Sequence, residues 1–141
     1  DIFDADGTKI GQLETKLTAA GVGSRLFDSG YKDAAMLYAK DSWNAFVGGL
    51  STTVDGVDVS VGTSFINTLF SGAAENFNSQ GASVNSDTPI ATHFSADTIM
   101  YSGAYASAIS AQEGVTITLE QPAGADSIAW KASLPITVSY Q

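Results

Sequence analysis

The chain has no cysteine and only one histidine. Without cysteine it forms no disulfide and no thiolate-based zinc site, and it has no thiol nucleophile. With a single imidazole, a transition-metal site would have to rely on carboxylates. The sequence therefore predicts no metal and no cofactor, although the missing cysteine does not fix the compartment in which the protein works.

Basic residues are also scarce. Six Lys or Arg stand against 15 Asp or Glu, which gives a formal net charge of −9. A chain without a Lys/Arg cluster cannot neutralise a row of phosphates, so we expect no nucleic-acid binding and no electrostatic docking on anionic membranes. No apolar run approaches the ~20 residues of a membrane-spanning helix, so we also expect no membrane insertion.

The residues that are present suit one domain with a real core. The length of 141 residues is typical of a single domain, and 44% of the residues are apolar. Only 15% are charged, against roughly a quarter in a typical soluble domain. Ser, Thr, Asn, Gly and Ala must therefore cover the surface, and such a mild, acidic, hydroxyl-rich exterior is more typical of exported than of cytosolic proteins.

Hydrophobic spacing predicts two short helices. Apolar residues recur at intervals of three and four over residues 33–50, where Gly48 and Gly49 would end the first helix. The second helix is predicted over residues 63–77. A loop is expected to follow it, over residues 78–88.

Alternation of apolar and polar residues predicts strands in the rest of the chain. The first strand surrounds Leu13–Leu17 and should break at the small residues 19–24. A short strand is predicted over Val57–Val61. Further strands fill most of the last third, over residues 90–101, 105–111 and 115–120.

The last strand has the clearest alternation. Pro135 cannot donate to a ladder, so this strand should lie at a sheet edge. An edge strand that is apolar on one face is an aggregation hazard unless a partner pairs with it. Its apolar face consists of Trp130, Ala132, Leu134, Ile136, Val138 and Tyr140. Together the elements indicate a mainly β protein, a β-sandwich with two short inserted helices.

No catalytic motif stands out. The segment Asp4–Gly7 lacks oxygen ligands at the first and last positions of an EF-hand loop, so a turn explains it better. His93 lies in a predicted strand without a G-x-S-x-G elbow, and we interpret it as structural or surface-exposed. The carboxylates fall in turns or on outward strand positions. We therefore predict that the chain is not an enzyme and has no catalytic residues.

Aromatic and charged residues gather before the first predicted helix, at Arg25, Phe27, Tyr31, Lys32 and Asp33. An aromatic platform beside a few polar groups on a loop is typical of a carbohydrate-binding site. The alternative is that Phe27 and Tyr31 only fasten the helix N-terminus to the sheet. The sequence leaves both readings open.

Several segments, in one order along nearly the whole chain, resemble FaeG-type fimbrial subunits of the κ-class chaperone–usher pili. These segments are the run Asp33–Val54 with its Gly-Gly-Leu-Ser-Thr-Thr-Val ending, Asn67–Gly72, Ser102–Ala106 and the ending Trp130–Tyr140. The resemblance implies an incomplete immunoglobulin-like sandwich that a donated strand completes. It also implies a fimbrial structural subunit and adhesin that polymerises by donor-strand complementation and attaches bacteria to host glycoconjugates.

The resemblance implies partners as well. These are neighbouring fimbrial subunits, a periplasmic chaperone, an outer-membrane usher and a host glycan receptor. The protein would then be exported through the periplasm and work in the extracellular fimbrium. The strand-acceptor and chaperone-binding edge would comprise Leu134, Ile136, Val138 and Tyr140.

The resembling subunits are considerably longer, so we expect residues 1–141 to form one pilin-like domain that lacks the family's N-terminal strands and donor extension. An alternative function from another class is a non-polymerising extracellular carbohydrate-binding or coat module with a β-sandwich fold.

Overall fold

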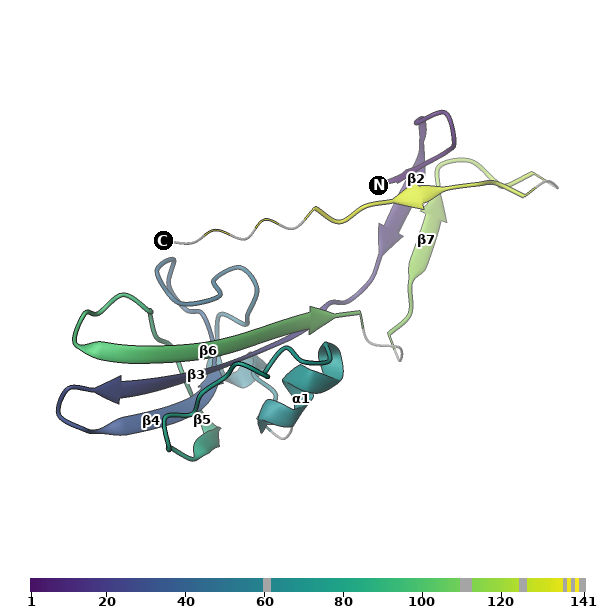
Figure 1. Ribbon diagram of the computed structural model, residues 1–141. Helices are drawn as coiled ribbons and strands as arrows, with labels where there is room; N and C mark the ends of the chain where they lie inside the picture. The colour runs from purple at the N-terminus through teal and green to yellow at the C-terminus, as the bar shows by residue number, and fades with distance from the viewer. Residues whose placement is uncertain (60–61, 110–112, 125–126, 136, 138, 140–141) are drawn as a thin grey trace. The chain divides into compact units, whose positions relative to one another are not determined.

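The computed structural model describes residues 1–59, 62–109, 113–124, 127–135, 137 and 139 (Figure 1). The chain groups into two compact units, which are considered one at a time. One unit is Leu17–Ser110, the central unit, and the other combines Asp1–Lys16 with Ala111–Gln141, the terminal unit.

The central unit is built on a four-stranded sheet in the order β5-β4-β3-β6 (Figure 1). β3 is antiparallel to β4 on one side and to β6 on the other, whereas β4 and β5 run parallel. The bounds of these elements are β3 (Thr18–Phe27), β4 (Lys32–Leu37), β5 (Val84–Ile90), β6 (Ile99–Ala108), the 3-10 turn η1 (Val54–Gly56) and the helix α1 (Gly62–Leu69).

One face of this sheet packs on α1. Val22 of β3 pairs with Met36 of β4 and with Ala104 of β6, so these side chains share a face. Ile66 of α1 is fully buried against them. The core cluster consists of Ala20, Val22, Met36, Ile66, Ala104 and Ala106, with Phe65, Leu69, Phe77 and Val84 packed around it.

On the opposite face of this sheet, glycines occupy positions that side chains from the loops cover. A Cβ on Gly103 would stand 2.7 Å from the Phe94 ring, and one on Gly21 would meet Leu50 at 2.9 Å. Phe46 stacks on Tyr105 with ring centroids 5.3 Å apart, and Phe94 contacts Phe46 edge to face. The glycines therefore make room for rings contributed by the loops.

The terminal unit has a second four-stranded sheet, in the order β7-β2-β1-β8, and all of its pairings are antiparallel. Its strands are β1 (Ile2–Phe3), β2 (Lys9–Glu14), β7 (Thr116–Leu119) and β8 (Lys131–Ala132). The predicted turn after β1 is confirmed. Asp4 Oδ1 accepts hydrogen bonds from the amides of Asp6 and Thr8, and Gly7 has a φ of +85°.

The predicted fold class is confirmed, since the structure is mainly β with two sheets, the content of a β-sandwich. The first of the two predicted helices is wrong. Residues 33–37 belong to β4, and turns follow through Leu50. Residues 34–37 are all buried, so β4 shows no polar alternation and its apolar run resembles a helix face. Phe46 and Gly48 then adopt positive φ values of 60° and 81°, which a right-handed helix does not allow.

Other boundaries shift for similar reasons. The small residues 19–24 lie inside β3, because glycine is tolerated where side chains cover the strand. The loop predicted over 78–88 includes the start of β5, and residues 91–98 are not strand. No strand forms at Val57–Val59, and residues 60–61 lie outside the described part. The second helix is confirmed in its first half, as α1, and the strand predicted over 115–120 is confirmed as β7. The strands predicted over 90–101 and 105–111 are instead replaced by one strand, β6, which runs without a break from Ile99 to Ala108.

Candidate functional site

The predicted carbohydrate residues lie on the hairpin that joins β3 to β4. Its loop, residues 28–30, is closed by hydrogen bonds from Phe27 N to Tyr31 O at 2.9 Å and from Gly30 N to Phe27 O at 2.8 Å. Gly30 has a φ of +83°, which a three-residue hairpin loop requires at its last position. Because no helix follows, Phe27 and Tyr31 close a hairpin and do not fasten a helix N-terminus.

Arg25 and Asp33 are cross-strand partners that form a two-pronged ion pair. Arg25 Nε lies 2.9 Å from Asp33 Oδ1, and Nη2 lies 2.5 Å from Oδ2. About a quarter of each side chain is exposed, at 24% and 25%. These hydrogen bonds raise the pKa of Arg25 above its ordinary value, an effect that partial burial opposes. The pair is thus neutral as a whole, and the guanidinium still presents donors along its free side.

Two aromatic rings continue from the ion pair toward the hairpin tip. The Arg25 guanidinium carbon lies 5.5 Å from the centroid of the Phe27 ring, within the range of a cation–π contact. Phe27 and Tyr31 follow with centroids 5.5 Å apart and a tilt of 50°. Tyr31 is 61% exposed, so its ring offers an open apolar surface beside polar groups.

Four of the five predicted residues are therefore brought together, and Lys32 is not. Lys32 pairs with Leu26, on the face opposite to Arg25 and Asp33. A Cβ on Gly81 would come within 2.7 Å of the Lys32 amine, which places this side chain beside the segment that follows α1.

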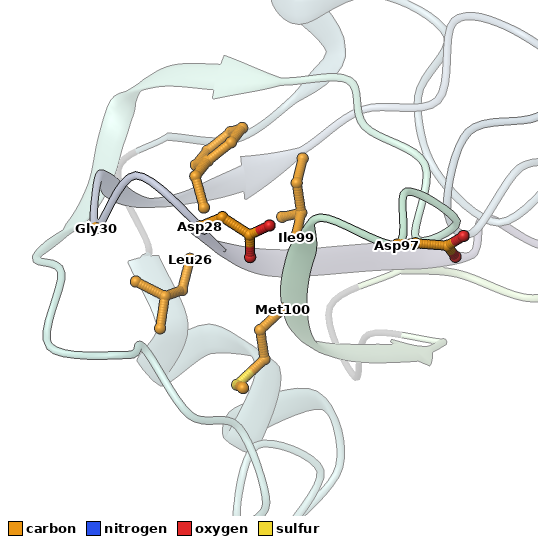
Figure 2. A pocket seen from close by; sticks show the side chains of 7 residues that line it. Leu26, Asp28, Gly30, Asp97, Ile99 and Met100 are labelled. Atoms are coloured by element: carbon orange, nitrogen blue, oxygen red, sulfur yellow. The ribbon is translucent and has the colours of Figure 1, made fainter.

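An open hollow of about 610 Å³ lies next to the hairpin tip (Figure 2). Its polar groups are the carboxylates of Asp28 and Asp97, which sequence reasoning missed. Asp97 joins the hollow because Phe27 pairs with Ile99 across β3 and β6, a pairing between residues distant in sequence. The whole lining is Leu26, Phe27, Asp28, Gly30, Asp97, Ile99 and Met100.

The second predicted site is the C-terminal segment. β8 is an outer strand of its sheet, which confirms the predicted edge position, but only Lys131 and Ala132 pair, with Phe3 and Ile2. Trp130 is 50% exposed and Leu134 66%. Ile136, Val138 and Tyr140, the other residues of the predicted acceptor edge, lie outside the described residues.

His93 and the carboxylates of the described residues do not gather into a metal centre. His93 is exposed, and its Nδ1 lies 2.8 Å from Oγ of Ser95, two residues along the same loop. The described residues contain no group of three His, Asp or Glu side chains able to hold a metal ion. Nor do they include a helix long and apolar enough to cross a bilayer.

Comparison with protein families decides the identity of the chain. The K88-type family described as "Fimbrial, major and minor subunit" matches residues 1–141, the whole chain. The chain belongs to this family of fimbrial subunits. No curated protein matches it. The resemblance stated from the sequence is thereby confirmed.

Family membership has direct consequences for this fimbrial subunit. The family consists of structural subunits and not of enzymes. Its members assemble with other pilus subunits in a fimbrium at the surface. Tyr31 of the hairpin and Leu134 of the C-terminal segment are both exposed in this fimbrial subunit.

Proposed function

We propose that this fimbrial subunit polymerises by donor-strand complementation at the β8 edge and attaches bacteria to host glycoconjugates through the β3–β4 hairpin. One observation carries the proposal. The apolar segment from Trp130 to Leu134 stands at a sheet edge, half to two-thirds exposed, with only two of its residues paired. Exposed apolar side chains beside a short edge strand are a place where a strand from another chain can add.

The thin packing of the terminal unit supports the same assignment. Ile2 is its one buried apolar side chain among the described residues, whereas Ile117 is 43% exposed and Ile128 44%. Each buried Å² of apolar surface is worth about 25 cal/mol, so an added strand with alternating apolar residues would contribute what the unit lacks. An open hollow of about 190 Å³ beside Trp130, lined also by Asp4, Ala5, Ala129 and Lys131, adjoins this edge.

Chaperone, usher and export belong to the same proposal. A periplasmic chaperone lends the covering strand first, and the neighbouring subunit replaces it as the usher passes the fibre outward. The acceptor edge comprises Leu134, whose exposed side chain is described, together with Ile136, Val138 and Tyr140. Residues 1–141 act as one pilin-like domain in this scheme.

Assembly is tested by placing a charge on either side of the same segment. Leu134→Lys puts an ammonium on the apolar parity of the strand, and Ser133→Lys puts the same charge on the opposite parity. In bacteria that carry the complete assembly genes, we expect Leu134→Lys to abolish incorporation into fimbriae and chaperone capture, and Ser133→Lys to leave both near normal. Equal incorporation of the two variants would refute donor-strand pairing at this edge.

The alternative, a module that never polymerises, makes a different prediction. Such a module would be a monomer whose melting temperature does not change when a donor strand is supplied. Thermal melts of the subunit alone and of the chaperone-bound subunit separate the two functions. If the subunit is completed by a donated strand, its melting temperature should be much higher in the chaperone complex.

The attachment role rests on the hairpin. Tyr31 offers an exposed ring next to Phe27 and the Arg25–Asp33 pair, and sugars bind such combinations of an apolar platform and hydrogen-bonding groups. A glycan array probed with the wild type and with Tyr31→Ala is the direct test. We expect glycan binding that Tyr31→Ala abolishes and that Lys32→Ala, on the other face, retains. An array without any signal for the wild type would remove the adhesin role.

A further inference from the structure

We infer that β6 is a second pairing edge, at which β6 of another copy of this subunit adds in antiparallel orientation, centred on Gly103. This contact lies in the central unit and is independent of the strand donation proposed for β8. It joins two four-stranded sheets into one continuous sheet.

Within the described central unit, the edge is long and regular and carries no charge, proline or bulge. β6 is the outer strand of its sheet, and all ten of its residues pair with β3, from Ile99 with Phe27 to Ala108 with Thr18, without a bulge. The strand reads IMYSGAYASA and contains neither a charged residue nor a proline. Exposed edges normally carry a Lys, a Pro, a bulge or a cover, since free amides and carbonyls invite another strand.

The other edges in the described part of the chain do carry such devices. β5 contains Asp87 and Pro89, and its pairing with β4 shifts register. β8 is two residues long and begins with Lys131. β7 has four residues, and Glu120 follows it directly. Among these four outer strands, β6 alone combines length with the absence of protection.

Among the described residues, three side-chain hydrogen bonds join β6 to loops. Two of them use side-chain groups of the strand and leave its backbone free. The Asn78 amide donates to Ser102 Oγ at 2.9 Å, and Tyr105 Oη donates to the Gly49 carbonyl at 3.2 Å.

The third reaches the backbone of the strand. The Gln80 side-chain amide donates to the Met100 carbonyl at 2.9 Å. A carbonyl oxygen has two acceptor sites, so Met100 retains capacity for a ladder bond. Gly103, at the centre of the strand, is exposed.

The sequence of β6 is self-complementary about Gly103. In antiparallel pairing centred there, Tyr101 of one copy lies opposite Tyr105 of the other, and Gly103 lies opposite Gly103. Cross-strand aromatic pairs of this kind stabilise a sheet. Because β6 has no charge, a charged partner strand would form no ion pairs with it. Subunits of this family assemble with one another, so a second copy is the partner at hand.

Engineered cysteines test the register, because the natural chain has none and any disulfide is assignable. Ile99→Cys and Ser107→Cys lie opposite each other in the inferred pairing, about 4.5–5.5 Å apart at Cα, which a disulfide can span. When two differently tagged copies are co-expressed in the periplasm with the assembly genes, we expect the mixed pair to cross-link several-fold more than Ser107→Cys with itself. Equal yields, or no cross-link, would overturn the inference.

A lysine at the edge provides the second measurement. Met100 is 63% exposed, and Met100→Lys adds to β6 the charge that other edges use as protection. In sedimentation equilibrium of the full chain, we expect Met100→Lys to raise the dimer dissociation constant about tenfold, and the control Ser42→Lys, in an exposed turn, to leave it unchanged or lower. Both variants reduce a net charge of −9, so general repulsion cannot explain a loss confined to Met100→Lys. A wild type that remains monomeric, with its β6 amides exchanging rapidly in hydrogen exchange, would also overturn the inference.

Discussion

The two units of this fimbrial subunit use the same architecture, a four-stranded sheet, with very different amounts of core. In the central unit a helix and two loops cover the sheet, and the unit holds ten of the eleven buried apolar residues among those described. In the terminal unit Ile2 is the other one, and Ile117, Trp130 and Leu134 are exposed. The terminal unit therefore has paired strands but little core, and small sheets need an apolar face that something covers.

The contrast separates stability from assembly. The central unit has a buried core of its own, so the hairpin tip and the β6 edge are not needed to build that core and are candidates for recognition. Both units expose large apolar side chains, such as Phe70 in the central unit and Leu134 in the terminal unit, but the terminal unit buries only Ile2 among its described apolar residues. This small core is the physical reason for assigning strand acceptance to the terminal unit. Substitutions in the central core should lower the stability of the free subunit, whereas substitutions at the terminal edge should lower stability only when a donated strand is bound.

The largest effect is expected in the central core. Ile66 is fully buried on α1, so Ile66→Ala leaves a cavity and should lower the free energy of unfolding by about 2–5 kcal/mol. Urea denaturation followed by circular dichroism measures this change. A loss below about 0.5 kcal/mol would mean that α1 is not packed as described.

The next effect tests the pairing of the terminal sheet. A Cβ on Gly11 would collide with the backbone carbonyl of Thr118 in β7, so Gly11→Ala should destabilise this sheet by about 1–3 kcal/mol. Gly114→Ala is the matched control, since nothing lies within 4 Å of its Cβ. Hydrogen exchange of the β2 and β7 amides should rise for Gly11→Ala only, and equal exchange in both variants would contradict the β2–β7 pairing.

A smaller effect is expected at the hairpin ion pair. Arg25→Met removes two hydrogen bonds to a partly buried carboxylate and should cost about 1–2 kcal/mol. Asp33 raises the pKa of Arg25 above its ordinary value, so this contribution is complete below that value and is lost only as the pH rises beyond it. Arg25 keeps its charge between about pH 6 and about pH 9. The difference in unfolding free energy between the wild type and Arg25→Met should therefore be the same at both pH values, as far as the ionisation of Arg25 is concerned. A contribution that fades by pH 9 would show that the guanidinium is not held as described.

Sequence reasoning predicted the β class, the second helix and the edge position of the last strand, because each depends on local periodicity. It mistook residues 33–37 for helix, since a strand buried on both faces loses its alternation. Because β4 was not predicted, the sequence did not show that Lys32 lies on the opposite face of the sheet from Arg25 and Asp33. The alternation of side chains along a strand would have shown it. Asp97 was missed because only the long-range pairing of β3 with β6 brings it to the hairpin.

The smallest effect is the most informative about the terminal unit. Leu134 is 66% exposed, so Leu134→Ala in the free subunit should change the unfolding free energy by no more than about 0.5 kcal/mol, in contrast with Ile66→Ala. Once a donated strand covers this edge, the same side chain becomes buried, and its truncation should then cost about 2–5 kcal/mol. Thermal unfolding of the variant with and without the chaperone measures both values. If Leu134→Ala changes stability neither in the free subunit nor in the complex, the exposed apolar edge has no role in assembly. If it leaves the free subunit unchanged but lowers the stability of the complex, the donated strand supplies the core that the terminal unit lacks.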